Sequence, residues 1–420
     1  KLFCAPWQLI ASPCKMPYAW RMQGLMQNTP LTTVHLFDRA EKYHRNKTVI
    51  TATPRGKETV TYGDWAQRTR KLGGVLNDLG ISEAGRVATF AWNTARHLEL
   101  YFAAPCTGRV LHTLNIRLFP EQLTYIVNHA EDEVIFCDKS LLPLLAPLFP
   151  TFHTVKHLVV MDDGPGDVPQ WPGVQIHDYE ELLSKAAPVE FSVTDENRAA
   201  SMCYTSGTTG NPKAALYSHR STLLHAYAAA LPDVMCISAR DSILPVVPMF
   251  HVNAWGIPYS AAMTGAKLVF PGPALDGKSI YELIEAEKVT FAAGVPTVWQ
   301  MLLSHMKPNG LNFSSLKRTV IGGSACPPAM IDAFRESYGV DVLHAWGMTE
   351  MSPLGTLCTL KNKHLNLSEE AQMKLRLKQG RAIFGVDMKI VNEAGESLPH
   401  DGKTYGDLLV KGPWIIREYY

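Results

Sequence analysis

The sequence has little net charge and no cluster of one sign. Its 420 residues include 40 Lys and Arg against 39 Asp and Glu, so the formal net charge is only +1. No run of five basic residues occurs anywhere along the chain. Proteins that hold nucleic acid or an anionic membrane by charge present a basic patch. The composition therefore argues against both kinds of partner.

Long apolar runs and paired cysteines are also missing. No apolar stretch reaches the roughly 20 residues that cross a bilayer, so we expect no integral membrane segment. The cysteines show neither CxxC spacing nor a neighbouring histidine cluster, which excludes the usual zinc and disulfide patterns and favours reduced thiols in the cytoplasm. They are Cys4, Cys14, Cys106, Cys137, Cys203, Cys236, Cys326 and Cys358.

The first 20 residues, KLFCAPWQLIASPCKMPYAW, do not begin with methionine and are apolar but broken by Pro6 and Pro13. Their apolar segment is too short and too interrupted for a secretory signal. We interpret residues 1–25 as an extension that is expected to be disordered. A single large domain is expected over residues 26–420, and the motifs described below indicate its kind.

Short β-branched runs alternate with amphipathic segments from Thr59 onward. The runs that indicate buried strands are residues 86–91, 133–138, 156–161, 267–270, 289–293 and 319–321. The segments with helical spacing are residues 62–79, capped near Gly63-Asp64, then 120–129, 220–231 and 279–288. This rhythm repeats too often for one small sheet, so it predicts an α/β protein with two lobes.

The most informative segment is residues 203–217, Cys-Tyr-Thr-Ser-Gly-Thr-Thr-Gly-Asn-Pro-Lys-Ala-Ala-Leu-Tyr. A strand expected at residues 201–204 leads into a loop with two glycines and four hydroxyl side chains, which Lys213 closes. Backbone N–H groups, hydroxyls and an ammonium group suit a polyphosphate. Pro212 stands where a Walker A loop needs glycine. By composition alone an ordinary loop is the commoner outcome.

As a complete string, this loop resembles the signature loop of the adenylate-forming superfamily, which comprises acyl-CoA synthetases, luciferases and peptide-synthetase adenylation domains. Three further segments resemble motifs of that family in the same order, namely residues 248–255 (PMFHVNAW), 322–325 (GGSA) and 344–350 (HAWGMTE). The resemblance covers residues 31–420. It is nearest to medium- and long-chain fatty acyl-CoA synthetases, mainly because Trp255 follows His251 by four residues.

The resemblance implies a large N-terminal lobe built from two βα subdomains with packed sheets plus a small distorted β-barrel. Residues 387–391 and 406–411 are expected to form antiparallel strands. The family continues with a Thr-Gly-Asp motif, a hinge and a C-terminal domain that carries a catalytic lysine, and the sequence stops before them. We therefore expect a C-terminally truncated enzyme that is inactive or poorly active. The resemblance to the long-chain synthetases separately implies a homodimer.

The family joins a carboxylate to ATP, releases pyrophosphate and passes the acyl group to coenzyme A. The resemblance thus implies ATP and Mg²⁺ as cofactors and coenzyme A as co-substrate, because charge builds on phosphate oxygens during the reaction. Our leading interpretation is the adenylation domain of a medium- or long-chain fatty acyl-CoA synthetase. Two alternatives stay open: a ligase for a short, aryl or thioether-substituted acid, and a fragment that binds ATP or acyl-AMP without turnover.

The resemblance also implies a role for individual residues. It makes His251, Thr349 and Glu350 catalytic and gives Mg²⁺ two contacts, Thr205 and Glu350. The residues implied for the acyl substrate are His251, Val252, Trp255 and Gly323. The residues implied for the nucleotide are Thr205, Ser206, Gly207, Thr208, Thr209, Gly210, Lys213, Gly323, Ser324, His344, Ala345, Trp346 and Thr349.

Several of these residues have ordinary alternatives. Without its motif, Glu350 would be an exposed acid at a helix start, and His251 or Trp255 would be a packed core residue. In the motif, Trp346 would lie against the adenine ring. Ala214 replaces the glycine usual after the loop lysine, a change that costs about 1 kcal/mol only if the backbone there has a positive φ.

Overall fold

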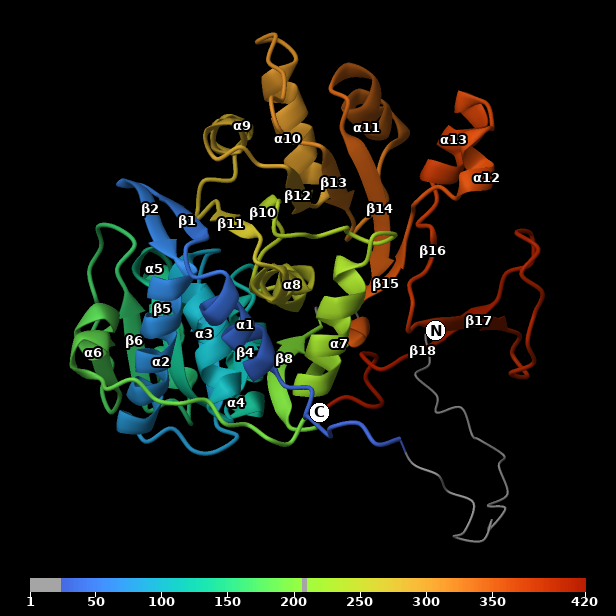
Figure 1. Ribbon diagram of the computed structural model, residues 1–420. Helices are drawn as coiled ribbons and strands as arrows, with labels where there is room; N and C mark the ends of the chain where they lie inside the picture. The colour runs from blue at the N-terminus through green and yellow to red at the C-terminus, as the bar shows by residue number, and fades with distance from the viewer. Residues whose placement is uncertain (1–23, 206–209) are drawn as a thin grey trace, which may run out of the picture.

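The computed structural model describes residues 24–205 and 210–420 and contains two large sheets with helices between and outside them (Figure 1). The predicted α/β class with two packed βα sheets is confirmed. The elements predicted from hydrophobic spacing lie within two residues of the observed ones. None of the described helices combines the length and the apolar character that a membrane crossing needs.

The first sheet has seven strands in the order β7-β6-β5-β3-β4-β8-β9. All neighbouring strands are parallel except β8 and β9, which are antiparallel. Residues 205–213, the predicted phosphate-binding loop (below, the phosphate loop), connect these two strands. The strands are β3 (Arg86–Phe90), β4 (Val110–Thr113), β5 (Asp132–Asp138), β6 (His157–Met161), β7 (Gln175–Asp178), β8 (Ala199–Tyr204) and β9 (Ala214–Ser218). The predicted strand at residues 201–204 is the second half of β8.

The second sheet has nine strands in the order β16-β15-β14-β13-β12-β10-β11-β1-β2, parallel from β14 to β1 and antiparallel at both ends. Its strands are β1 (Thr48–Thr53), β2 (Gly56–Thr61), β10 (Ser242–Pro245), β11 (Lys267–Phe270), β12 (Phe291–Gly294), β13 (Arg318–Ile321), β14 (Asp341–Gly347), β15 (Leu354–Leu357) and β16 (Arg381–Ala382).

Helices form the remaining layers. They are α1 (Thr33–Tyr43), α2 (Tyr62–Asp78), α3 (Ala95–Cys106), α4 (Pro120–Ala130), α5 (Leu142–Leu145), α6 (Tyr179–Lys185), α7 (His219–Ala230), α8 (Ile257–Thr264), α9 (Gly277–Ala286), α10 (Pro296–Met306), α11 (Pro328–Asp332), α12 (Asn362–Leu365) and α13 (Glu369–Arg376). Helices α3 and α8 are buried along almost their whole length, because their apolar residues belong to the core shared by both sheets.

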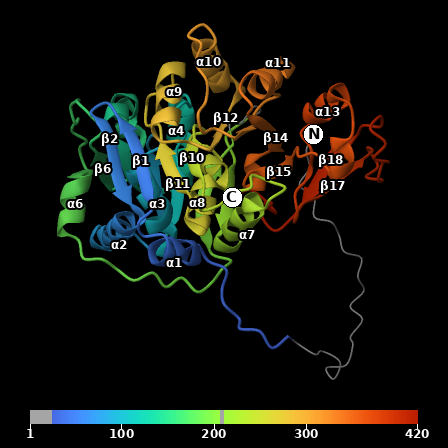
Figure 2. The same cartoon turned by 45° about the horizontal axis from the view of Figure 1, so that its top comes forward.

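Strand alternation explains the layers. In β3, Val87 faces the shared core while Ala88 and Phe90 face a second core with α4 and α5. Successive side chains of a strand point to opposite faces, so one strand supplies two cores. Helices α9, α10 and α11 cover the outer face of the nine-stranded sheet through a third core (Figures 1 and 2).

The region expected to hold a small distorted β-barrel contains β17 (Asp387–Val391) and β18 (Asp407–Lys411). These strands pair with each other in the predicted antiparallel sense and form a two-stranded sheet in the described part of the chain. The pair lies to one side of the two large sheets, near α13 (Figure 2). The chain then returns from β18 toward the seven-stranded sheet, where Tyr420 N donates to Ala214 O.

The expected cap of the first long helix requires a correction. Helix α2 is capped by Thr61, whose hydroxyl accepts from the backbone N–H of Asp64, while the Asp64 carboxylate accepts from the backbone N–H of Thr61. This reciprocal capping box satisfies two N–H groups that the helix leaves unpaired. Gly63 and Asp64 therefore lie inside the first turn, and the cap is two residues earlier than expected.

Asp138, the last residue of β5, leads to a testable stability effect. It is fully buried, its Oδ2 accepts from Trp92 N at 2.7 Å, and its Oδ1 has no partner among the described residues. Burial, with the charge of Asp163 adding to it, raises the pKa of Asp138 to about 8. The folded protein thus holds a proton that the unfolded chain releases near pH 4.

We expect Asp138→Asn to stabilise the protein increasingly as the pH rises. The stability that wild-type Asp138 provides is full below its unfolded pKa and is lost as pH rises toward 8, whereas the amide stays neutral throughout. The gain in unfolding free energy should be small near pH 4 and reach a few kcal/mol near pH 8, measured by denaturant unfolding. A constant difference between variant and wild type across that range would contradict the assignment.

Candidate active site

A cavity of about 170 Å³ lies where the motif segments meet. It is lined by Met235, His251, Val252, Trp255, Val320, Gly322, Gly323, Ala345, Trp346, Gly347, Met348, Thr349, Pro353 and Leu354. Its walls come from the segments that follow β10 and β13 and from the end of β14. Parallel strands present their carboxyl ends at one edge of a sheet, which is where α/β proteins bind ligands. Three motifs separated in sequence therefore form one site.

The segment after β10 makes an unusual turn. Residues Val252, Asn253, Ala254 and Trp255 have φ of 44°, 50°, 47° and 56°, and Gly256 follows at 75°. A left-handed turn costs about 1–2 kcal/mol per non-glycine residue. Asn253 offsets part of this cost, because its Nδ2 donates to Ser201 Oγ at 2.9 Å and its Oδ1 accepts from Cys203.

The turn directs Trp255 into the cavity wall, where its indole is 7% exposed. A side chain at Gly322 would approach the ring to 3.4 Å, and one at Gly323 would meet Val295 at 3.2 Å. Gly323 also has a φ of 80°, which favours glycine. The two glycines thus leave room for the indole, which forms part of the cavity wall.

His251 precedes the turn and lines the cavity while remaining exposed to solvent. The surrounding protein atoms lower the pKa of its imidazole, and the positive charge of Arg117 lowers it further. Both effects favour the neutral ring at physiological pH. A neutral imidazole at the mouth of the cavity can donate one hydrogen bond to a carboxylate and needs no counter-ion.

The turn between β14 and β15 carries Trp346, Thr349 and Glu350. A side chain at Gly347 would meet Pro353 O at 2.0 Å, so only glycine fits there, and Met348 N donates to Pro353 O at 3.0 Å. Tyr217 Oη on β9 donates to Thr349 O at 2.6 Å. The turn is therefore fixed from within and is also tied to the seven-stranded sheet.

Glu350 is a buried carboxylate with features of a cation ligand. It is 8% exposed, accepts a hydrogen bond from Tyr419 Oη, and forms no ion pair with any residue that the structure describes. A buried carboxylate normally has a charged partner, and one or two such groups suffice for Mg²⁺, which keeps several waters. The donor set thus fits Mg²⁺. Within the described ranges, no group of three or more His, Cys, Asp or Glu side chains forms a metal site of the transition-metal type.

The phosphate-loop segment is described only at its two ends. Thr205 Oγ1 accepts from Lys213 N at 3.2 Å, and Thr205 N donates to Lys213 O at 2.8 Å, so these two residues pair at the base of the loop. Gly210 is exposed with a φ of 96°. The other predicted loop residues, Ser206, Gly207, Thr208 and Thr209, lie outside the described residues. Neither Thr205 nor Lys213 lines the 170 Å³ cavity.

Ala214 does not strain the backbone. It is buried in β9, pairs with Tyr204 across the sheet and is absent from the described residues with positive φ. Alanine therefore fits this position without the cost that a left-handed conformation would carry.

Besides Thr205, Gly210 and Lys213, two further predicted nucleotide residues, His344 and Ser324, do not line the cavity. His344 is 2% exposed, and its ring is held by the backbone: Nδ1–H donates to Leu377 O at 3.2 Å and Nε2 accepts from Cys326 N at 3.4 Å. Burial lowers the pKa of this imidazole, in agreement with a neutral ring. Ser324 is exposed next to Gly323. Four predicted nucleotide residues do line the cavity, namely Gly323, Ala345, Trp346 and Thr349.

Sequence reasoning missed part of the cavity wall. The unpredicted members are Met235, Val320, Gly322, Gly347, Met348, Pro353 and Leu354. Gly322, Gly347 and Met348 stand within the quoted motifs, so their position could have indicated them. Met235 lies between α7 and β10, far from any motif, and no sequence signal marks it.

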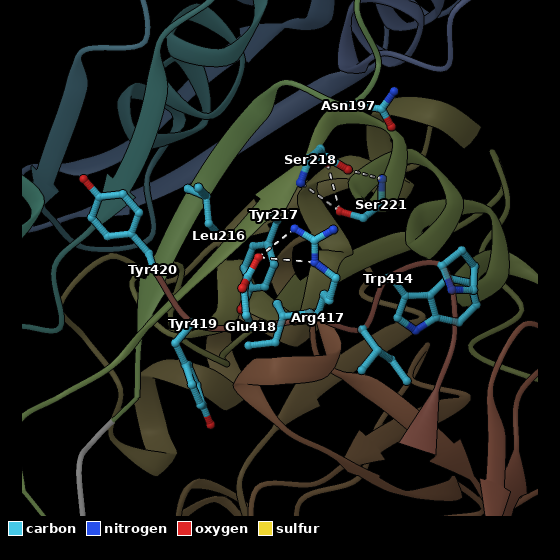
Figure 3. Close-up of a pocket in the computed structure, with 13 residues that line it drawn as sticks. Asn197, Leu216, Tyr217, Ser218, Ser221, Trp414, Arg417, Glu418, Tyr419 and Tyr420 are labelled. Atoms are coloured by element: carbon cyan, nitrogen blue, oxygen red, sulfur yellow. Dashed lines mark hydrogen bonds and ion pairs between the residues drawn. The ribbon is translucent and has the colours of Figure 1, made fainter. Parts of the chain in front are cut away.

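A larger hollow of about 600 Å³ lies next to this site, between β9, the start of α7 and residues 413–420 (Figure 3). Its wall includes Tyr217, Ser218 and Ser221 from the sheet side and Trp414 and Tyr419 from the other. Tyr217 is shared by both regions, because its hydroxyl reaches Thr349 O. The smaller cavity is the candidate site, since it contains the convergent motif residues.

Comparison with known proteins shows the family of the chain. Residues 36–420 match the family model described as AMP-binding enzyme. The chain is 51% identical over 402 residues to a 3-methylmercaptopropionyl-CoA ligase of Ruegeria lacuscaerulensis, covering 95% of this chain and 74% of that protein. It is 49% identical over 404 residues to a medium-chain-fatty-acid–CoA ligase of Ectopseudomonas oleovorans, covering 95% and 73%.

The fold is also found among solved structures. The crystal structure of an anthranilate CoA ligase in complex with anthranoyl-AMP superimposes with a TM-score of 0.81 at 22% identity, over 94% of this chain and 73% of that one. At this identity the likeness concerns the fold. The same arrangement of two packed sheets is thus shared with a protein that holds an acyl-adenylate.

Proposed function

Because the chain belongs to the family of AMP-binding enzymes, we propose that it forms an acyl-adenylate from ATP and a short, unbranched carboxylic acid, as the first half of an acid–coenzyme A ligase reaction. The observation that carries this proposal is the convergence of His251, Trp255, Trp346 and Thr349 on one cavity from three separate segments. Their chemistry suits a carboxylate, an apolar chain, a purine ring and a phosphate respectively.

In the proposed reaction, each residue acts on one part of the substrates. The neutral His251 ring donates to the acid carboxylate and orients it, while Trp346 offers an apolar face to the adenine. The Thr349 hydroxyl donates to a phosphate oxygen, and Glu350 would hold Mg²⁺, which neutralises charge on the phosphate oxygens. Trp255 closes the cavity behind the acyl group and excludes water from the carboxylate.

The size and lining of the cavity support a short acid. About 170 Å³ is below the 300–1,000 Å³ typical of pockets for larger ligands. The inner wall is apolar, with Met235, Val320 and Leu354 around Trp255. A thioether sulfur and a methylene have similar size and polarity, so an apolar wall distinguishes them weakly. This favours the thioether acids named for some relatives and straight-chain acids of the same length.

A medium-chain fatty acid is the second candidate. The relative from Ectopseudomonas oleovorans, at 49% identity, is named for that substrate class. A longer chain would need Trp255 to rotate out of the cavity, since the indole fills its inner end. The medium- or long-chain fatty acid expected from the sequence would therefore require that rotation of Trp255.

We expect acyl-adenylate mimics to rank by acyl length. Non-hydrolysable sulfamoyl-adenosines carrying pentanoyl or 3-(methylthio)propanoyl groups should bind within about 10-fold of each other, because the exchange conserves volume. The hexadecanoyl mimic should bind roughly 10–100-fold more weakly, since overfilling a packed cavity costs about 1–3 kcal/mol. Titration calorimetry on the 420-residue chain measures all three. Tightest binding of the hexadecanoyl mimic would reverse the assignment.

Coenzyme A as co-substrate, a homodimer and a cytoplasmic location belong to the same proposal. The relatives named as CoA ligases support the first. The described cysteines, six in number, are all unpaired, which suits a reducing compartment. Sedimentation at micromolar concentration tests the dimer directly.

A further inference from the structure

The segment after β18 crosses back over the candidate site. Trp414 anchors it: the ring is 3% exposed, Nε1 donates to Leu354 O at 3.1 Å, and its carbonyl accepts from Ser352 Oγ at 2.9 Å. Further along, Ile416 N donates to Glu350 O at 2.9 Å and Tyr420 N donates to Ala214 O at 3.0 Å. Residues 416–420 thus span from the Glu350 turn to the strand that follows the phosphate loop.

Tyr419 lies between these two backbone attachments. Its hydroxyl donates to Glu350 Oε1, and its ring lies 5.1 Å from Lys213 Nζ, on which the phosphate loop ends. Tyr420 points away from Tyr419 (Figure 3) and packs edge-on against His129 with ring centroids 5.7 Å apart. The two neighbouring tyrosines therefore have different surroundings, and only Tyr419 touches the predicted metal ligand.

We propose that Tyr419 is the positioning residue of the metal and phosphate site: its hydroxyl orients the Glu350 carboxylate toward a divalent cation, and its ring seats the Lys213 ammonium group toward the nucleotide phosphates. The inference rests on the proposed function, because it takes Glu350 as the cation ligand. It adds a residue that none of the sequence motifs contains.

The two carboxylate oxygens of Glu350 have different surroundings. A carboxylate offers about four lone-pair positions on two oxygens, and Tyr419 occupies one position on Oε1. Oε2 accepts no hydrogen bond from the residues that the structure describes, so it is open to a cation. Ligating carboxylates are commonly held by such outer partners, whose loss costs about 10–100-fold in metal affinity.

The aromatic ring of Tyr419 acts separately from its hydroxyl, because it contacts the ammonium group of Lys213. An ammonium group over an aromatic face is attracted to it, and the contact also restricts the four-carbon lysine stem. Lys213 is exposed, so without the ring it would sample many rotamers in water. Tyr419 thereby holds one anionic and one cationic side chain on either side of the space expected for the triphosphate.

The test separates the hydroxyl from the ring. ATP binding to the 420-residue chain is measured by calorimetry with saturating Mg²⁺, with a Mg²⁺ series, and with EDTA. Tyr419→Phe keeps the ring, so the Mg²⁺ concentration required should rise about 10–100-fold while ATP affinity in EDTA stays at the wild-type value. Tyr419→Leu should show the same Mg²⁺ defect and also lose roughly 2–5-fold in EDTA.

Tyr420→Phe is the matched control and should bind ATP like wild type under all three conditions. Thermal unfolding of each variant reports the fold, and a purely structural role would lower both affinities together instead of splitting them. An unchanged Mg²⁺ requirement in Tyr419→Phe overturns the inference and leaves the proposed function standing. Tighter Mg²⁺ binding overturns it too, since the hydroxyl would then compete with the cation. Wild-type binding of ATP that is indifferent to Mg²⁺ overturns both proposals.

Discussion

Replacing Glu350 by glutamine is expected to abolish the Mg²⁺ dependence of ATP binding. Glutamine keeps the size of the side chain and an oxygen that accepts from Tyr419, but it removes the charge that attracts the cation. The affinity for Mg²⁺·ATP should fall about 100-fold or more, beyond the 10–100-fold cost of losing an outer partner. Calorimetric titration with Mg²⁺ and with EDTA measures the effect.

In EDTA, the expected change in ATP affinity has the opposite sign, which distinguishes a metal ligand from a structural residue. Without a cation, the buried Glu350 carboxylate repels the triphosphate, so Glu350→Gln should bind metal-free ATP at least as well as wild type. Glu418→Gln is the control, because Glu418 lies beside Tyr419 and pairs with Arg417 in solvent. Equal loss of ATP affinity in EDTA and in Mg²⁺ would indicate damage to the fold and would refute the metal assignment.

The Trp255→Ala variant should accept longer acyl chains. Removing the indole opens the inner end of the cavity, and each further methylene that becomes buried contributes about 0.8 kcal/mol, or about fourfold in affinity. The decanoyl adenylate mimic should therefore gain relative to the pentanoyl mimic, while affinity for ATP changes little. The measurement is the ratio of the two dissociation constants in variant and wild type.

The same change should lower stability by about 3–5 kcal/mol, since the indole is 7% exposed within the shared core. Trp299→Ala is the matched control: Trp299 is on α10 and fully buried in the outer core, so its loss should cost similar stability without altering chain-length preference. Trp255→Phe serves as the milder variant if the alanine protein fails to fold. An unchanged ratio of dissociation constants would place the acyl chain elsewhere.

The sequence predicted most of the central strands because their β-branched runs face two apolar cores. The first residues of helices were predicted less accurately, because a capping side chain decides where each helix begins. Helix α9 was expected to begin at Ser279, but Asp276 caps it by accepting from Lys278 N and Ser279 N, so the helix begins two residues earlier. The cap of α2 was misplaced for the same reason: a single hydroxyl or carboxylate fixes the start, and several nearby residues can supply it.

The candidate site was predictable only where a motif carries it. His251, Trp255 and Trp346 were identified through their resemblance to family motifs, and all three line the cavity. Met235 and Leu354 line the same cavity through tertiary packing, such as the hydrogen bond from Leu354 N to His225 Nε2 on α7, which leaves no local sequence pattern. Tyr419 was missed because its role exists only after the chain returns from β18 across the site.

The left-handed turn at residues 252–256 also bears on the order in which the molecule folds. Local preference opposes this turn, and its partners Ser201 and Cys203 lie about 50 positions earlier in the chain. Contacts of such separation form only after loop closure has been achieved. Strand β8 must therefore be in place before the turn is stable, and the inner end of the acyl cavity is acquired late. A destabilised molecule would lose selectivity for the acid while its sheets are still formed.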